Sequence, residues 1–295
     1  NTLVQNVVGP NGIGIDPQPR ASNGEIHDAF ARQIAAIYED WCRRPEVTWC
    51  HDWASSQRLA CRTWLRDGEM LGQMIAGTNP TLDHGTRVPF SVELIEPDFL
   101  PLDYNTADKP RIVGGIEVNG WNRPRAFHLY KQHPGDFVGF TNAADTRRVS
   151  ADNILHLKHV TRLGQLRGVS LFAPVMLRLD DIKDYEESER IAAKVAASMA
   201  AYIKKGTPDL YDVELDADGA PIDQRHLKFR PGMIFDDLLP GEDIGTIDTN
   251  RPNANLEPHR NGQLRAAASG LYLTYSSLSK DYNGTYSAQR QELVE

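Results

Sequence analysis

The longest amphipathic segment of the chain spans residues 179–205 and reads LDDIKDYEESERIAAKVAASMAAYIKK. Its apolar residues recur at spacings of three and four, which predicts one continuous helix that ends before Gly206. Acidic residues gather in the first turns, and Lys204 and Lys205 occupy the last turn, as the helix dipole favours. A helix of this length would extend for about 40 Å.

The residues after this helix lose helical periodicity and then regain it. Segment 206–252 contains Pro-Gly and Asp-Gly turn signals and strand-like runs at 227–229 and 233–235. Helical spacing returns over residues 256–275. We therefore expect a helix, a compact β excursion and a second helix.

The first half of the chain predicts helices followed by strands. Gly and Pro residues between positions 7 and 20 favour an extended entry segment. Apolar periodicity predicts helices over 27–44 and 55–76, and alternation predicts strands over 88–94, 112–118, 126–130 and 153–157. Asn119–Gly120 would form the tight turn of a hairpin. The fold class is thus α+β, with antiparallel strands.

Composition excludes several classes of protein. The chain has 295 residues and a net charge of −8, and 40% of its residues are hydrophobic, which is typical of a globular protein. No run approaches the roughly 20 apolar residues of a membrane span. Excess acid argues against tight binding of phosphates, but it allows a protein that lets DNA pass.

Three cysteines, Cys42, Cys50 and Cys61, cannot all pair with one another, and their spacing matches no common zinc site. So few cysteines favour a reducing cytoplasm, and no export signal is visible after Asn1. The sequence therefore predicts neither a structural metal nor a disulfide framework.

The sequence lacks the motifs of common enzyme classes. The sequence contains no phosphate loop, dinucleotide fingerprint or nucleophile elbow. His156 and His159 would face opposite sides of a strand, which disfavours joint chelation. One alternative remains open, a metal-dependent nucleic-acid-processing enzyme with a site built from Asp98, Asp145, His156 and His159. Another is a small adaptor that binds only protein.

Two blocks of sequence carry a resemblance to a known family. The first is residues 163–170, LGQLRGVS, and the second comprises the motifs 268–271, 280–283 and 286–290. Together they resemble the lambda-type portal proteins of tailed bacteriophages and prophages. Shorter matches at 96–98, 115–118 and 239–242 extend the resemblance along nearly the whole chain. Residues 271–273, LYL, depart from the usual family pattern.

The resemblance implies a structural protein rather than an enzyme, without cofactor or metal. It implies a ring, usually of twelve copies, at one capsid vertex of the virion, assembled in the host bacterial cytoplasm. Double-stranded DNA would pass through the ring without sequence-specific contacts. The implied partners are other copies of the chain, the terminase large subunit, capsid and scaffold proteins, and a head–tail adaptor, with no membrane.

The resemblance also implies a division of the chain. Residues 1–177 would form the wing, 178–205 the first stem helix, 206–252 the clip, 253–275 the second stem helix, and 276–295 the tunnel loop and the start of the C-terminal wing. The implied DNA-channel residues are Lys280, Asp281, Tyr282, Asn283 and Arg290. The implied residues facing terminase or the adaptor are Asp216, Asp218, Arg225, Lys228 and Arg230.

Overall fold

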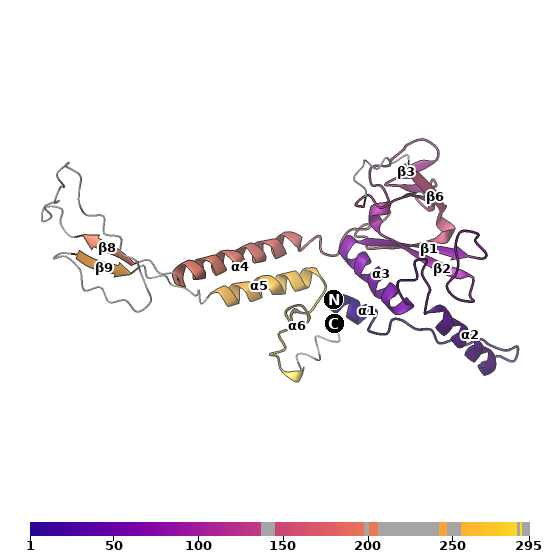
Figure 1. The fold of residues 1–295 in the computed structure, drawn as a ribbon, viewed down its shortest axis with the longest axis horizontal. Coiled ribbons are helices and arrows are strands. Elements are labelled where there is room, and N and C mark those ends of the chain that lie inside the picture. The colour runs from indigo at the N-terminus through magenta and orange to yellow at the C-terminus, as the bar shows by residue number, and fades with distance from the viewer. Residues whose placement is uncertain (137–144, 198–200, 206–241, 247–254, 288–289, 291–295) are drawn as a thin grey trace, which may run out of the picture. The chain divides into compact units, whose positions relative to one another are not determined.

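The computed structural model describes residues 1–136, 145–197, 201–205, 242–246, 255–287 and 290. They belong to two units (Figure 1). The first comprises residues 1–176 and 268–295, and the second comprises residues 177–267. The order of helices and antiparallel strands confirms the predicted α+β class. Among the described helices, none is long and apolar enough to cross a bilayer.

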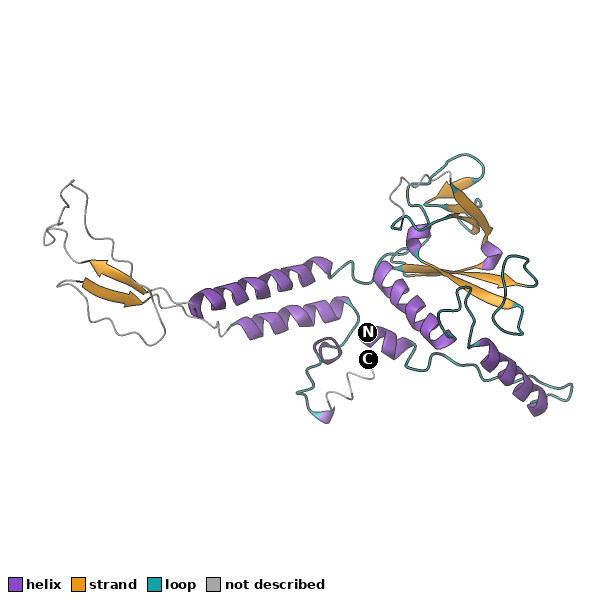
Figure 2. Cartoon of the chain, in the orientation of Figure 1, coloured by secondary structure: helices purple, strands orange, loops and turns teal. Residues whose placement is uncertain are grey.

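The centre of the first unit is a three-stranded antiparallel sheet (Figure 2). Strand β1 (Glu69–Ala76) lies between β2 (Phe90–Ile95) and β7 (Ile154–Lys158). In this register, Leu71 lies opposite both Ile95 and His156. The strands predicted over 88–94 and 153–157 are confirmed as β2 and β7.

A second antiparallel sheet contains four strands, β3 (Arg111–Val113), β4 (Ile116–Val118), β5 (Pro124–Tyr130) and β6 (Thr146–Ser150). Its buried apolar residues form one core with those of the first sheet. The largest fully buried members of that core are Phe127, Leu71, Leu100, Ile116 and Leu129. This shared core fixes both sheets within the first unit.

The predicted hairpin is present, but its details were wrong. Gly114 and Gly115 adopt positive φ angles and divide the expected strand 112–118 into β3 and β4. The next turn spans residues 119–123, and its non-glycine residue with positive φ is Asn122. The Asn119 side chain accepts hydrogen bonds from the backbone N–H groups of residues 121 and 123, which stabilises the longer loop.

Three helices precede the sheets in sequence: α1 (Thr2–Val7), α2 (Asp28–Trp41) and α3 (Trp53–Asp67). The helix predicted over 27–44 is confirmed as α2, whereas α1 was not predicted. The helix predicted over 55–76 was wrong in its second half. Gly68 ends α3 with a φ of 87°, a left-handed conformation that suits glycine, and the chain then continues as β1.

The second unit contains two antiparallel helices, α4 (Met176–Ala197) and α5 (Leu256–Gly270). Arg260 forms an ion pair with Glu186 at 2.8 Å, and the rings of Tyr185 and His259 lie 4.8 Å apart. Beyond α4, strand β8 (Ala201–Lys205) pairs antiparallel with β9 (Glu242–Thr246).

These bounds correct both long helices that the sequence predicted. The helix expected over 179–205 ends at Ala197, because residues 201–205 form a strand ladder with 242–246. Its 22 residues span about 33 Å. The helix expected to reach Tyr275 ends at Gly270, because the Thr274 side chain accepts a hydrogen bond from Ser277 N–H and caps a new helix, α6 (Tyr275–Ser279).

Candidate functional site

The block at 163–170 lies across the junction between α3 and β1. The backbone N–H of His159 donates to the carbonyl of Gly68 at 2.7 Å, and that of Leu171 donates to Leu65 at 3.2 Å. Between them, Val169 N–H donates to the His159 carbonyl at 2.9 Å. Backbone hydrogen bonds therefore fix both ends of the block against this junction.

A buried carboxylate holds the middle of the block. Glu69, whose side chain is 4% exposed, accepts hydrogen bonds from Arg167 Nε at 2.6 Å and from Gly168 N–H at 2.9 Å. It also accepts one from His156 Nε2 at 3.0 Å. We call these four residues, Glu69, His156, Arg167 and Gly168, the Glu69 network.

Arg167 extends the Glu69 network to the second sheet. Its Nη1 donates to the carbonyls of Leu100 and Gly114, each at 3.0 Å. The guanidinium therefore joins β1 to the turn between β3 and β4. Arg167 thus donates hydrogen bonds to two buried carbonyls and one buried carboxylate. A buried network whose polar groups are all hydrogen-bonded specifies one arrangement of these segments.

The electrostatics of Glu69 follow from these contacts. Burial by itself would raise the pKa of the carboxyl group, but hydrogen bonds from His156 and Arg167, together with the Arg167 charge, outweigh burial. They lower the pKa of Glu69 to about 2, from an ordinary value of 4.5. The folded protein therefore binds a proton at Glu69 less readily than the unfolded chain does.

We expect the free energy of unfolding to decrease in acid because of Glu69. The pKa of the folded state is the depressed one, so the stabilisation is complete above about pH 4.5 and is lost as pH falls towards 2. At about 1.4 kcal/mol per pKa unit, the loss amounts to roughly 3 kcal/mol. Denaturant unfolding between pH 7 and pH 2 measures it. A Glu69→Gln variant with the same decrease would contradict the assignment.

Two glycines permit the close approach of the block to the α3–β1 junction. A Cβ atom added to Gly168 would lie 2.1 Å from the carbonyl oxygen of Gly68. A Cβ atom added to Gly68 would lie 2.1 Å from the carbonyl carbon of Val169. No side chain fits between these two backbone segments, which explains glycine at both positions.

The chain leaves and re-enters the first unit just beyond this block. Val175 is buried, and its Cγ1 would lie 2.4 Å from a Cβ atom on Gly270. Ala268 and Leu271, in the returning segment, are each 2% exposed. The Glu69 network thus positions the segment that leads into α4, and the glycine at 270 lets the outgoing and returning segments pack closely.

The four residues of the alternative enzyme site are not brought together. His156 belongs to the Glu69 network, while His159 Nδ1 lies 3.2 Å from the Val169 carbonyl. Asp145 pairs with Lys131. Asp98 lies 3.7 Å from a different histidine, His133. The hypothesis of a metal site built from Asp98, Asp145, His156 and His159 was therefore wrong.

Glu96, Asp98 and His133 form a different cluster of potential metal ligands, whose ligand atoms all lie within 4.8 Å of one another. However, Gly135 N–H donates to His133 Nδ1 at 3.0 Å, so the neutral ring carries its proton on Nε2. That nitrogen faces Glu96 at 3.3 Å. A metal bound at Nε2 would need the opposite tautomer, whose Nδ1 proton would face the Gly135 N–H.

The predicted channel residues Lys280 to Asn283 directly follow α6. Lys280 ends that helix with a φ of 60° and is exposed, and Asn283 N–H donates to the Asp281 carboxylate at 3.2 Å. Tyr282 is 58% exposed, and Arg290 is exposed as well. The residues predicted to face terminase or the adaptor, Asp216, Asp218, Arg225, Lys228 and Arg230, lie outside the described residues, as do the strand-like runs predicted at 227–229 and 233–235.

Sequence reasoning missed Glu69, the centre of the network, because it lay inside a predicted helix. The signal that could have found it is an acidic residue placed directly after Gly68 and before the apolar run 70–71. A carboxylate at the start of a buried strand requires a partner, and Arg167 in the 163–170 block is that partner.

Comparisons with known proteins agree with this architecture. A probable portal protein of Halomonas phage phiHAP-1 is 26% identical over 294 residues, covering 96% of this chain and 54% of the relative. The chain thus spans about half the length of this curated relative. Among solved structures, the neck of an empty gene transfer agent (GTA) particle, computed with C6 symmetry, matches with a TM-score of 0.53 at 16% identity. The match covers 88% of this chain and 63% of that one.

The neck of a native GTA particle, computed with C12 symmetry, has a TM-score of 0.51 at 14% identity, and the match covers 85% of this chain and 63% of that one. At these identities, the two structures support the fold alone. The family model of phage portal proteins, lambda family, matches residues 1–295. The chain therefore belongs to the lambda family of phage portal proteins.

Proposed function

We propose that this chain is the protomer of a ring of about twelve copies at one capsid vertex, where it forms the channel for DNA packaging and ejection. The match of the portal family to all 295 residues carries this proposal. In it, the protein is a structural conduit and not an enzyme, and a separate motor ATPase drives the DNA. The ring acts in the virion, after assembly in the host cytoplasm.

The second unit supports an oligomer. None of the described α4 side chains, 176–194, is buried. Those that are half-buried, Leu179, Ile182, Tyr185, Glu189 and Ala192, recur at three- and four-residue spacings, while Leu177 and Ile191 are 81% and 52% exposed. A helical hairpin with so little core is covered most simply by the same hairpins of neighbouring copies.

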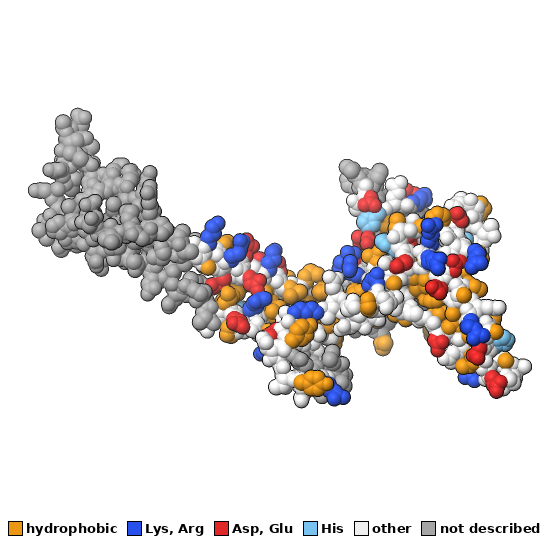
Figure 3. All heavy atoms as spheres, turned by 60° about the horizontal axis from the view of Figure 1, so that its bottom comes forward, with side chains coloured by type: hydrophobic (Ala, Val, Ile, Leu, Met, Phe, Trp, Pro, Cys, Tyr) orange, Lys and Arg blue, Asp and Glu red, His pale blue; other side chains and the backbone are white. Residues whose placement is uncertain are grey.

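The size of such a ring suits a duplex. Twelve helices side by side, at roughly 10 Å spacing, have a circumference of about 120 Å and leave a bore of about 28 Å. Figure 3 shows acidic and basic side chains interspersed along α4 and α5 on the face drawn, without one basic patch. Mixed charge of this kind gives weak contacts to phosphates, which suits sliding.

We also propose a division of the chain into parts, in which the two stem helices are α4 and α5 with the bounds that the structure gives. Residues 1–177 are the wing, 178–205 and 253–275 contain the stem helices, 206–252 are the clip, and 276–295 are the tunnel loop and the start of the C-terminal wing. In the proposal, the clip binds the terminase large subunit and a head–tail adaptor. Capsid and scaffold proteins surround the ring.

We expect the assembled ring to hold duplex DNA weakly. Within the proposed tunnel loop and start of the C-terminal wing, residues 276–295, Lys280 and Arg290 are the only basic residues. Each phosphate contact contributes about −0.9 to the slope of log K against log salt. The double variant Lys280→Gln, Arg290→Gln removes two positive charges from each protomer. It should therefore change that slope by no more than about 2 for each protomer that contacts the DNA. Fluorescence anisotropy of labelled duplex across a salt series measures the slope, and strong binding that salt abolishes would contradict weak guidance.

Ring formation itself is tested by native mass spectrometry of the purified full chain. The proposal predicts one discrete oligomer of about a dozen copies. A chain that remains monomeric over a range of salt and protein concentrations, and with scaffold protein added, would overturn the proposal.

A further inference from the structure

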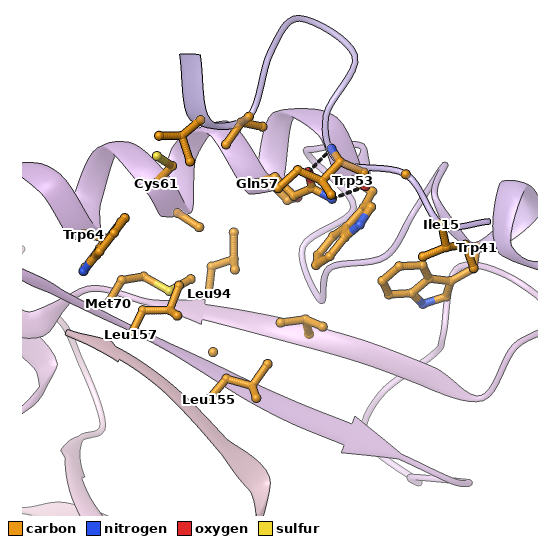
Figure 4. Close-up of a pocket in the computed structure, with 18 of the residues that line it drawn as sticks. Ile15, Trp41, Trp53, Gln57, Cys61, Trp64, Met70, Leu94, Leu155 and Leu157 are labelled. Atoms are coloured by element: carbon orange, nitrogen blue, oxygen red, sulfur yellow. Dashed lines mark hydrogen bonds between the residues drawn. The ribbon is translucent and has the colours of Figure 1, made fainter. Parts of the chain in front are cut away.

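The first unit contains an apolar pocket of about 640 Å³ between α3 and the three-stranded sheet (Figure 4). Trp53, Cys61 and Trp64 line it from the helix, and Met70, Leu94 and Leu155 line it from the sheet. The pocket is open, because Leu155 remains 53% exposed. An exposed hollow with this lining is stabilised by an apolar occupant.

Helix α2 of the same unit has the opposite shape, a protruding apolar stripe. Phe30, Ile34, Ile37 and Trp41 recur at spacings of four, three and four and so share one face. Only Trp41 is buried, whereas Phe30 and Ile37 are 50% and 52% exposed. We call Phe30, Ile34 and Ile37 the α2 stripe.

The length of α2 indicates that the stripe has a partner. Isolated helices of about 12–15 residues are marginal in water, and α2 has 14 residues with one buried side chain. The apolar pocket of the same chain cannot cover the whole stripe. Trp41 lines the pocket, and Phe30 lies about 16 Å further along the helix axis. The stripe therefore needs an apolar surface that the described residues of its own chain do not supply.

Charges on the two helices are complementary. Helix α2 carries Asp28, Glu39 and Asp40 against the single basic Arg32. Helix α3, which forms one wall of the pocket, carries Arg58, Arg62 and Arg66 against a single acidic residue. Asp40 already pairs with Arg87, and Arg66 pairs with Asp67. The remaining charges, Asp28 and Glu39 on α2 and Arg58 and Arg62 on α3, are opposite in sign and favour the approach of α2 to α3 of another copy.

We propose that the α2 stripe of one copy inserts into the apolar pocket of the next copy around the ring. This inference rests on the proposed function, because a ring needs a heterologous interface, in which two different surfaces of each chain meet. The protruding stripe and the pocket are such a pair on one unit. In a closed ring, this contact would cover the α2 stripe and the pocket of every copy.

A disulfide test places one thiol on the stripe and one on the exposed wall of the pocket. The native Cys61 does not serve, because it is 6% exposed and packs against Val4 and Val8 of its own chain. In a Cys42→Ser, Cys50→Ser, Cys61→Ala background, we combine Ile34→Cys with Leu155→Cys, at a pocket residue that is 53% exposed. Copper phenanthroline in air oxidises adjacent thiol pairs, and dioxygen accepts the two electrons. We expect a ladder of covalent oligomers on non-reducing gels. Ala36→Cys with Leu155→Cys, and Ile34→Cys alone, should give no ladder.

A second variant fills the pocket without disturbing the strand. A Cβ atom on Gly72 would lie 3.6 Å from Val92 Cγ1 and 3.8 Å from Leu155 Cβ, both ordinary contacts. Gly72→Leu should therefore keep the circular dichroism spectrum and melting temperature, yet weaken ring assembly at least tenfold. Phe30→Glu should do the same, and Ala36→Glu should not.

The outcomes separate this inference from the proposed function. If the wild-type chain forms rings but Ile34→Cys with Leu155→Cys gives no ladder, or folded Gly72→Leu assembles normally, the α2 insertion is wrong and the ring stands. A small apolar molecule found in the pocket of assembled rings by mass spectrometry would also overturn it. If the wild-type chain forms no ring at all, the proposed function fails first.

Discussion

Replacing Glu69 by Gln should lower the free energy of unfolding by about 3–5 kcal/mol at pH 7. The substitution keeps the size of the side chain but leaves the Arg167 guanidinium, 14% exposed, without its counter-charge. Breaking one partner of a buried ion pair costs this much because the other charge remains desolvated. Urea denaturation followed by tryptophan fluorescence measures the change.

The matched control for Glu69 is Glu93, which pairs with Arg147 at 2.7 Å nearer the surface. Glu93→Gln should cost no more than about 1 kcal/mol, since exposed ion pairs contribute little. Comparable losses in the two variants would show that burial of the Glu69 network does not decide its contribution.

Replacing Gly68 by Ala should be the second large effect, a loss of about 2–5 kcal/mol. Two costs combine: the φ of 87° disfavours any side chain, and the new Cβ atom would meet the backbone of Val169 at 2.1 Å. Because that backbone is also held by the Glu69 network, it cannot move away cheaply.

Gly164→Ala isolates the first of these costs. Gly164 has a φ of 73°, yet an added Cβ atom would meet nothing within 4 Å. Its loss should be limited to the conformational strain of about 1–2 kcal/mol. Thermal and chemical unfolding of both variants gives the difference, and equal losses would contradict the close approach of the block to Gly68.

The elements predicted correctly from the sequence are those with a clear apolar period. Helix α2 shows a single apolar stripe, and in strand β2 the apolar Phe90, Val92 and Leu94 alternate with Ser91 and Glu93. Strand β1 was mistaken for a helix because it is the central strand of its sheet, and its first four residues are all buried. A strand buried on both faces has no alternation to detect.

The site was less predictable, because its contacts connect distant parts of the chain. Glu69 and Arg167 are 98 residues apart, and no local pattern pairs them. The resemblance correctly singled out residues 163–170, but only the structure shows why Arg167 and Gly168 are needed there. Likewise, β8 continues the apolar pattern of α4, and its pairing with β9 across more than 35 residues decides that it is a strand.

In the proposed function, copies of this chain assemble into a ring through which DNA passes. Electron microscopy of the purified full chain tests this assembly. We expect closed rings of about twelve copies around an open channel wide enough for a duplex, with helices α4 and α5 in the channel wall. Rings closed at the centre, or a channel too narrow for duplex DNA, would contradict it.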